Sequence, residues 1–289
     1  MLKDKNRSGR PPIENTAAIL HSVENFPDLS LRKRAEAIGT SKNTIYRELR
    51  SIGCSPKRGR WIPHELTNAH RQKRVDACEQ LIARQRSSPF LGQLVTMDES
   101  WVHYDGRVRP IHWLRPGQVA KGTPKPNPLG KKVMLVVFWA KWGIIHWETL
   151  PQGIGLNSER FCAILDHVKV ALQDASARGL LRRAPILQMD NAPCHRANAT
   201  QSHIKYVLGW EQIVHPPYSP DLAPSDFHLF RSMKNHLRGV RFQNNADLEN
   251  WLTNFFESKN GTNFYQRGIQ KLQEKWRTVI NNNGHYIFT

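Results

Sequence analysis

Hydrophobic positions near the start of the chain recur at helical spacing in three short stretches, separated by turn residues. These stretches are Asn15–Asn25, Leu31–Ile38 and Lys42–Ser51. Ser30 and Ser41 precede the second and third stretches, where a serine side chain can accept a hydrogen bond from the first helical turn. The pattern predicts a small three-helix unit, with Gly39 in the turn between its last two helices.

Within this unit the sequence favours a helix-turn-helix. Ala35, Gly39 and Ile45 stand where that motif needs a small residue, a turn glycine and a buried aliphatic side chain. The outer face of the third helix would then present Lys42, Asn43, Tyr46, Arg47 and Arg50. Arginine and asparagine can hydrogen-bond guanine and adenine edges in the major groove. We therefore predict a DNA-binding domain at 13–53; a three-helix bundle with a solvated basic face is the alternative.

The flanking segments are basic. Residues 1–12 contain Gly-Arg-Pro, and Arg10 could enter the narrow minor groove of A·T-rich DNA. Residues 54–90 are interpreted as a linker carrying a helix from about Thr67 to Gln85, with Arg74 on its outer side.

Beyond residue 90 the hydrophobic pattern alternates between strands and helices. The expected strands are Leu91–Met97, Lys132–Ala140, Ile144–Leu150, Ala184–Met189 and Gln212–His215. The expected helices are Asn157–Ala177, Cys194–Val207 and Asp226–Arg238, the last capped by Ser225. A hairpin followed by alternating helices and strands predicts an α/β domain with a mixed sheet at 91–289.

The charge and composition of the chain limit the kinds of molecule that it is expected to bind. The 289 residues carry a formal net charge of +18, and 39% of them are hydrophobic, enough for a folded core. No apolar stretch is long enough for a membrane helix. The four cysteines are scattered, which argues against a disulfide scaffold or a zinc ribbon. A folded chain this basic is expected to bind a polyanion, with nucleic acid as the first candidate.

Three aspartates stand at informative places in the α/β segment. Asp98 and Asp190 each follow a predicted strand, and Asp226 begins a predicted helix. Carboxylates that converge need a counterion, and a divalent metal ion is the obvious one. Two Mg²⁺ or Mn²⁺ ions at such a site would support phosphodiester cleavage.

Other residues compete for these roles. Glu99 adjoins Asp98, but neighbouring side chains on a strand point to opposite faces. Asp221 lies between prolines and leucine, where a turn-capping role is natural. Cys194 and His195 lie near Asp190, yet no second histidine or cysteine cluster supports a zinc site there.

Four sequence blocks resemble those of mariner-type transposases. They are Trp-Ile-Pro-His-Glu-Leu (61–66), Met-Asp-Glu-Ser-Trp (97–101), Asp-Asn-Ala-Pro-Cys-His (190–195) and Tyr-Ser-Pro-Asp-Leu-Ala-Pro-Ser-Asp (218–226). The C-terminal residues from Phe264 to Tyr286 are also similar to the family's ending. The resemblance covers nearly the whole chain.

The resemblance implies an RNase H-like catalytic domain, with a mixed five-stranded sheet and flanking helices. Asp98, Asp190 and Asp226 would form the catalytic, metal-binding triad, and Asp221 would belong to a loop motif. Residues at about 105–131 would be an insertion after the first strand. The spacing between the last two aspartates is one residue longer than the family's pattern, and the family's first helix-turn-helix is expected to be missing.

Further expectations follow from the same resemblance. The family cuts DNA at inverted terminal repeats and joins the freed 3′-hydroxyl to TA target sites, using two Mg²⁺ or Mn²⁺ ions and no small-molecule cofactor. A homodimer and a nuclear location in a eukaryotic host are expected. The alternatives are a truncated, inactive or domesticated copy that only binds DNA, and another RNase H-like nuclease such as a bacterial insertion-sequence transposase.

Overall fold

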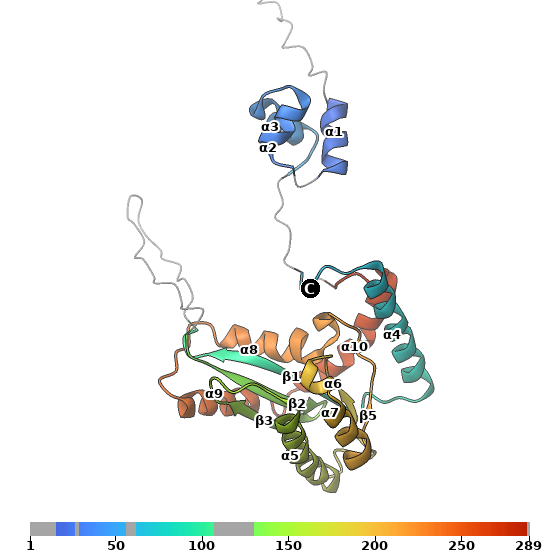
Figure 1. The fold of residues 1–289 in the computed structure, drawn as a ribbon, viewed down its shortest axis with the longest axis vertical. Helices are drawn as coiled ribbons and strands as arrows, with labels where there is room; N and C mark the ends of the chain where they lie inside the picture. The colour runs from blue at the N-terminus through green and yellow to red at the C-terminus, as the bar shows by residue number, and fades with distance from the viewer. Residues whose placement is uncertain (1–15, 27–28, 56–61, 107–129, 288–289) are drawn as a thin grey trace, which may run out of the picture. The chain divides into compact units, whose positions relative to one another are not determined.

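The computed structural model describes residues 16–26, 29–55, 62–106 and 130–287 (Figure 1). It divides into two compact units, Met1–Trp61 and Ile62–Thr289. Each unit has its own hydrophobic core, and each is described here by itself. None of the described helices is long and apolar enough to cross a membrane.

The smaller unit contains the three predicted helices, α1 (Thr16–Asn25), α2 (Leu31–Ile38) and α3 (Lys42–Ser51). Ser30 accepts a hydrogen bond from the Lys33 amide and Ser41 from the Thr44 amide, so both predicted N-caps are confirmed. Ile19, Ala35 and Ile45 form the core between the helices. Gly39 ends α2 with a φ of 72°, the left-handed conformation that glycine adopts at little cost.

A buried arginine closes this small core. Arg34 on α2 donates to the Ser22 hydroxyl at 2.5 Å and to the Phe26 carbonyl oxygen at 2.8 Å. These bonds tie α2 to the end of α1. They add to the core of Ile19, Ala35 and Ile45, against which Leu31, Ile38 and Leu49 also pack.

The larger unit is built on a five-stranded sheet of order β3-β2-β1-β4-β5. Its strands are β1 (Leu94–His103), β2 (Lys132–Ala140), β3 (Gly143–Leu150), β4 (Ile186–Gln188) and β5 (Glu211–Gln212). The first three pair antiparallel, whereas β4 runs parallel to both β1 and β5. This is the mixed sheet that the sequence predicts, and the fold is RNase H-like.

Helices cover both faces of this sheet (Figure 1). The longer ones are α4 (Asn68–Ser87), α5 (Ser158–Ala177), α9 (Asn245–Glu257) and α10 (Phe264–Asn281). Alternate side chains of β2 enter two separate cores, because Val137 and Trp139 face α4, α9 and α10 while Val136 and Phe138 face α5. The continuous apolar run of β2 follows from this burial on both faces.

Shorter helical segments connect the remaining elements. They are α6 (Pro193–Arg196), α7 (Asn198–Ser202), η1 (His203–Leu208), η2 (Pro220–Leu222), η3 (Ser225–Phe230) and α8 (Arg231–His236). The single helix predicted at 194–207 is wrong, because Ala197 is extended with a ψ of 139°. Thr200 and Gln201 donate side-chain hydrogen bonds to the carbonyl oxygens of Cys194 and His195, which a continuous helix would have used.

Three other expectations are corrected. β1 runs on to His103, so Asp98 lies within the strand rather than after it. Ser225 does not cap a helix with its side chain; its hydroxyl accepts a hydrogen bond from the Trp139 indole. Helix α4 is not part of a linker, because it packs against α10 in the larger unit, where Arg74 is fully buried.

Candidate active site

The sheet register sets Asp98 and Asp190 at the same level on neighbouring strands. β1 and β4 are parallel, and Thr96 lies opposite Gln188. Asp98 is two residues beyond the first of these and Asp190 two beyond the second. The two aspartates therefore lie at the same end of the parallel pair, although Asp98 is inside β1 and only Asp190 follows the end of its strand.

Asp226 reaches this edge from the first turn of η3. Two hydrogen bonds hold the start of that segment against the sheet. The Trp139 indole donates to the Ser225 hydroxyl at 3.0 Å, and the Gln188 side-chain amide donates to the Leu222 carbonyl oxygen at 3.1 Å. The Asp226 carboxyl group lies close enough to Asp98 and Asp190 for the three charges to interact. The structure thus brings all three predicted triad residues together.

Burial and mutual repulsion dominate the electrostatics of this cluster. Desolvation, followed by the charges of Asp226 and Glu99, raises the pKa of Asp98 well above its ordinary value. Desolvation also raises the pKa of Asp226, against the lowering effect of its hydrogen bond to Asp98. Burial and the neighbouring charges thus disfavour the ionised forms of both carboxyl groups, and a bound cation would relieve this repulsion.

His195 joins the third aspartate to Glu99. Its Nδ1 lies 2.8 Å from Asp190 Oδ1 and its Nε2 lies 3.0 Å from Glu99 Oε1, with the side chain only 1% exposed. Burial alone would lower the pKa of His195, but hydrogen bonds to Asp190, Cys194 and Glu99 raise it to about 12. The imidazolium therefore donates to both carboxylates at neutral pH.

This bridge also sets the ionisation of Asp190. Burial acts to raise the pKa of Asp190, yet hydrogen bonds from His195 and from the Ala192 amide outweigh it and lower the pKa. Sequence reasoning noted His195 only as a weak zinc candidate. Its position five residues after Asp190, in the block Asp-Asn-Ala-Pro-Cys-His, is the signal that could have indicated this role.

Asp221 faces away from the triad and anchors the fold. Arg74 donates to both Asp221 carboxylate oxygens, at 2.8 and 2.7 Å, and its side chain is 0% exposed. The Ile287 amide adds a third hydrogen bond to Asp221 at 3.0 Å. The loop role expected for Asp221 thus takes the form of a buried ion pair that joins α4, the loop and the C-terminal segment.

The loop around Asp221 also contacts His64, which comes from the Trp-Ile-Pro-His-Glu-Leu block. His64 stacks on Tyr218 with ring centroids 3.8 Å apart, and His70 meets the same ring edge-on at 5.1 Å. Tyr218 has a φ of 52°, unusual for a residue with a side chain. A cavity of about 390 Å³ opens beside this loop, and Asp190 and Asp226 are both in its lining. The aromatic contacts therefore shape one wall of the acidic site.

The donor set of the triad suits hard divalent cations. Its side chains offer carboxylate oxygens, which Mg²⁺ and Mn²⁺ prefer. Asp190 is 49% exposed at its side chain, so the cluster opens to solvent on that side. Asp98, Asp190 and Asp226 are the ligands that the sequence predicts for a two-metal site, and their carboxylate oxygens are of the kind that these ions prefer.

The predicted DNA-contacting residues lie on the smaller unit. Lys42, Asn43, Tyr46, Arg47 and Arg50 are all exposed on α3. Arg10 and most of the insertion at about 105–131 lie outside the described residues.

An RNase H-like sheet that presents three carboxylates at one edge defines the class of DDE nucleases and strand transferases. A sequence profile of the family described as "Transposase (partial DDE domain)" matches residues 103–182. The chain is 36% identical to the Mariner Mos1 transposase of Drosophila mauritiana, over 98% of this chain and 82% of that protein. It belongs to the mariner transposase family.

Other relatives agree with this assignment. The human histone-lysine N-methyltransferase SETMAR is 38% identical over 99% of the chain, which spans only 42% of the length of SETMAR. The Mos1 strand transfer complex superposes with a TM-score of 0.86 at 36% identity, covering 99% of this chain and 83% of that one. A Mos1 paired end complex with Mn gives a TM-score of 0.87 at 35% identity, with the same coverage.

Proposed function

We propose that this protein is an active transposase that cleaves DNA at the inverted terminal repeats of its element and transfers the 3′-hydroxyl ends into TA target sites. The observation that carries the proposal is the convergence of Asp98, Asp190 and Asp226 at one edge of the sheet. Relatives solved as a strand transfer complex, and as paired end complexes with Mn and with Mg, support it.

The chain's own residues would prepare the site in three ways. Asp98 and Asp226, fixed by β1 and by η3, would hold divalent ions whose charge offsets the repulsion between the two carboxyl groups. His195 would keep Asp190 ionised and fixed in orientation. When bound, two Mg²⁺ or Mn²⁺ ions would activate the attacking oxygen and stabilise the leaving oxygen of the phosphodiester.

The smaller unit would supply DNA binding. Its exposed α3 face carries three cations and an asparagine, a set that suits base edges and phosphates. The overall charge of +18 would strengthen association with DNA at low salt. A homodimer working at paired ends and a nuclear location in a eukaryotic host are further parts of the proposal, to be tested by light scattering and by imaging a tagged chain.

The experiment is a nicking assay on a plasmid carrying the element's ends, with Mg²⁺ or Mn²⁺. Asp98→Asn, Asp190→Asn and Asp226→Asn should each abolish nicking while DNA binding persists. Asp174→Asn is the matched control, because Asp174 is 67% exposed on α5 and forms a salt bridge with the nearby, equally exposed Arg178. Asp221 is unsuitable as a control because it is part of the buried ion pair.

The same assay distinguishes an active transposase from the main alternative, a protein that only binds DNA. A folded wild-type chain that binds the terminal repeats but never nicks them, at any divalent ion concentration, would be a DNA-binding protein only. Nicking that survives all three triad substitutions would show that the acidic cluster is not the catalytic site.

A further inference from the structure

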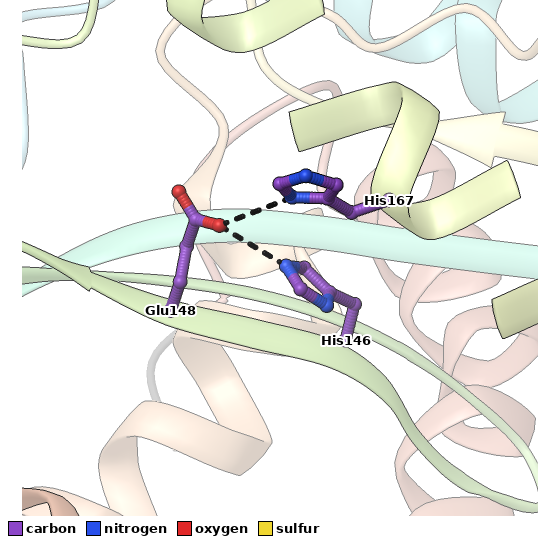
Figure 2. Close-up of side chains that lie close together, drawn as sticks. All are labelled: His146, Glu148 and His167. Carbon is purple, nitrogen blue, oxygen red and sulfur yellow. Dashed lines mark hydrogen bonds and ion pairs between the residues drawn. The ribbon is translucent and has the colours of Figure 1, made fainter. Parts of the chain in front are cut away.

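A second group of metal-ligating side chains lies apart from the acidic site. His146 and Glu148 on β3 and His167 on α5 each offer a ligand atom, and these three atoms lie within 4.8 Å of one another (Figure 2). From this cluster we infer that the protein binds one Zn²⁺ ion between the edge strand β3 and helix α5. The inference is independent of the proposed transposition chemistry.

The sheet directs both β3 ligands toward α5. His146 lies opposite Phe138 and Glu148 opposite Val136, and both of these β2 residues belong to the core that α5 covers. The pairing of β2 with β3 shifts register between Phe138 and Trp139. This shift changes which β3 side chains point to which face of the sheet. Trp147 consequently packs on Phe256 at the opposite face, which leaves its two neighbours free to face α5.

The distances fit a metal better than a set of hydrogen bonds. His146 Nε2 is 3.2 Å and His167 Nδ1 is 3.6 Å from the same oxygen, Glu148 Oε2. The longer distance exceeds the range of an N–H···O hydrogen bond. Ligand atoms about 2.1 Å from a tetrahedral zinc ion stand roughly 3.4 Å apart, midway between the two values. Small side-chain rotations would therefore complete the site.

The donor set selects the metal. Two imidazole nitrogens and one carboxylate oxygen suit Zn²⁺, whereas Mg²⁺ prefers oxygen ligands in an octahedron. The three side chains are 24%, 28% and 63% exposed, in chain order, so an ion can enter from solvent and water can fill the fourth position. The ion would fasten an edge strand of the sheet to the helix above it. The protein would thus use two different kinds of metal at two different sites.

The test is a calorimetric Zn²⁺ titration of the full chain, with Mg²⁺ in excess to occupy the acidic site. Removing a ligand with His146→Ala, His167→Ala or Glu148→Gln should weaken one Zn²⁺ site by about tenfold or more, roughly 1.4 kcal/mol per factor of ten. His203→Ala is the matched control, because His203 on η1 contacts Asp166 of α5 at 3.0 Å and forms only a pair with it among the described residues. The Zn²⁺ affinity of the His203→Ala variant should equal that of the wild type.

A second readout identifies the ligands directly. Co²⁺ in place of Zn²⁺ should give visible absorption typical of nitrogen ligation in the wild type and His203→Ala, and lose it in the three ligand variants. All three substitutions are at partly exposed positions, and circular dichroism will confirm that each variant is folded. The inference is overturned if the wild type takes up no Zn²⁺ at micromolar concentration, or if the His146→Ala/His167→Ala double variant binds it equally well.

Discussion

Two aspartates in the same loop motif, Asp221 and Asp226, have opposite environments. Asp221 receives two hydrogen bonds from the buried Arg74 and one from a backbone amide, so its charge is compensated within the fold. Asp226 lies near Asp98, and burial raises the pKa of both carboxyl groups. The first site stabilises the protein, whereas the second stores unfavourable charge that a ligand can relieve.

The comparison shows how to separate structural from catalytic carboxylates. A satisfied carboxylate is costly to remove, because its partner is left buried and charged. A carboxylate in a repulsive cluster costs stability while it is present, and its removal relieves repulsion. Stability and activity should therefore respond in opposite ways to substitutions at the two positions.

Asp221→Ala is expected to reduce the free energy of unfolding by about 3–5 kcal/mol, because Arg74 would remain buried without a counterion. Urea denaturation followed by tryptophan fluorescence measures the loss. Replacing both partners, Arg74→Met with Asp221→Leu, should restore much of the stability. A loss below about 1 kcal/mol for Asp221→Ala would show that the ion pair does not anchor the fold.

His195→Ala is expected to slow nicking by about 10–100-fold, because Asp190 loses the donor that fixes its orientation. The rate should be measured across a range of Mn²⁺ concentrations, since a positioning role predicts weaker apparent metal affinity. His203→Ala, which alters another histidine–carboxylate pair, should leave the rate unchanged. Equal metal dependence for His195→Ala and the wild type would contradict the positioning role.

Asp98→Asn is expected to increase stability at neutral pH in the absence of metal, because burial and the neighbouring charges disfavour the ionised carboxyl group of Asp98. A carboxyl group with a raised pKa binds its proton more tightly in the folded state. Its contribution is fully present below the unfolded pKa, about 3.8, and is lost as the pH rises through the folded pKa.

Thermal denaturation between pH 4 and pH 8 tests this sign. The wild type should lose stability relative to Asp98→Asn as the pH rises across that range, and saturating Mg²⁺ should remove the difference. A variant that is less stable than the wild type at every pH would place Asp98 among the structural carboxylates.

Arg47→Ala on α3 has the smallest expected effect. It should weaken binding to DNA severalfold and reduce the slope of log affinity against log salt by about 1, if Arg47 contacts a phosphate. Fluorescence anisotropy with a labelled terminal repeat measures both quantities. Lys33→Ala, an exposed cation on α2, is the matched control. Equal losses for the two variants would indicate that only total charge matters.

Much of the secondary structure could be predicted because its signals are local. The serine caps of α2 and α3, the Gly39 turn and the β2–β3 hairpin all lie where the pattern placed them. Predictions failed where contacts between residues far apart in the sequence determine the position of a side chain. The prediction that Arg74 lies on the outer side of its helix was wrong, because its partner Asp221 lies 147 residues further along the chain. The Ser225 cap was wrong because the hydroxyl accepts from Trp139 instead.

The sequence by itself determined the class of protein, since periodicity defines the elements and the motif blocks identify the three aspartates and the family. Only the tertiary structure decided how these residues are used. The parallel register of β1 and β4 places Asp98 and Asp190 at the same height along the two strands. The buried His195 contacts two carboxylates, those of Asp190 and Glu99. The folded sheet also brings His146 and Glu148 to His167 of another element. The physical reason is that pairing, burial and electrostatic coupling depend on distances in space, which a linear pattern of residues does not contain.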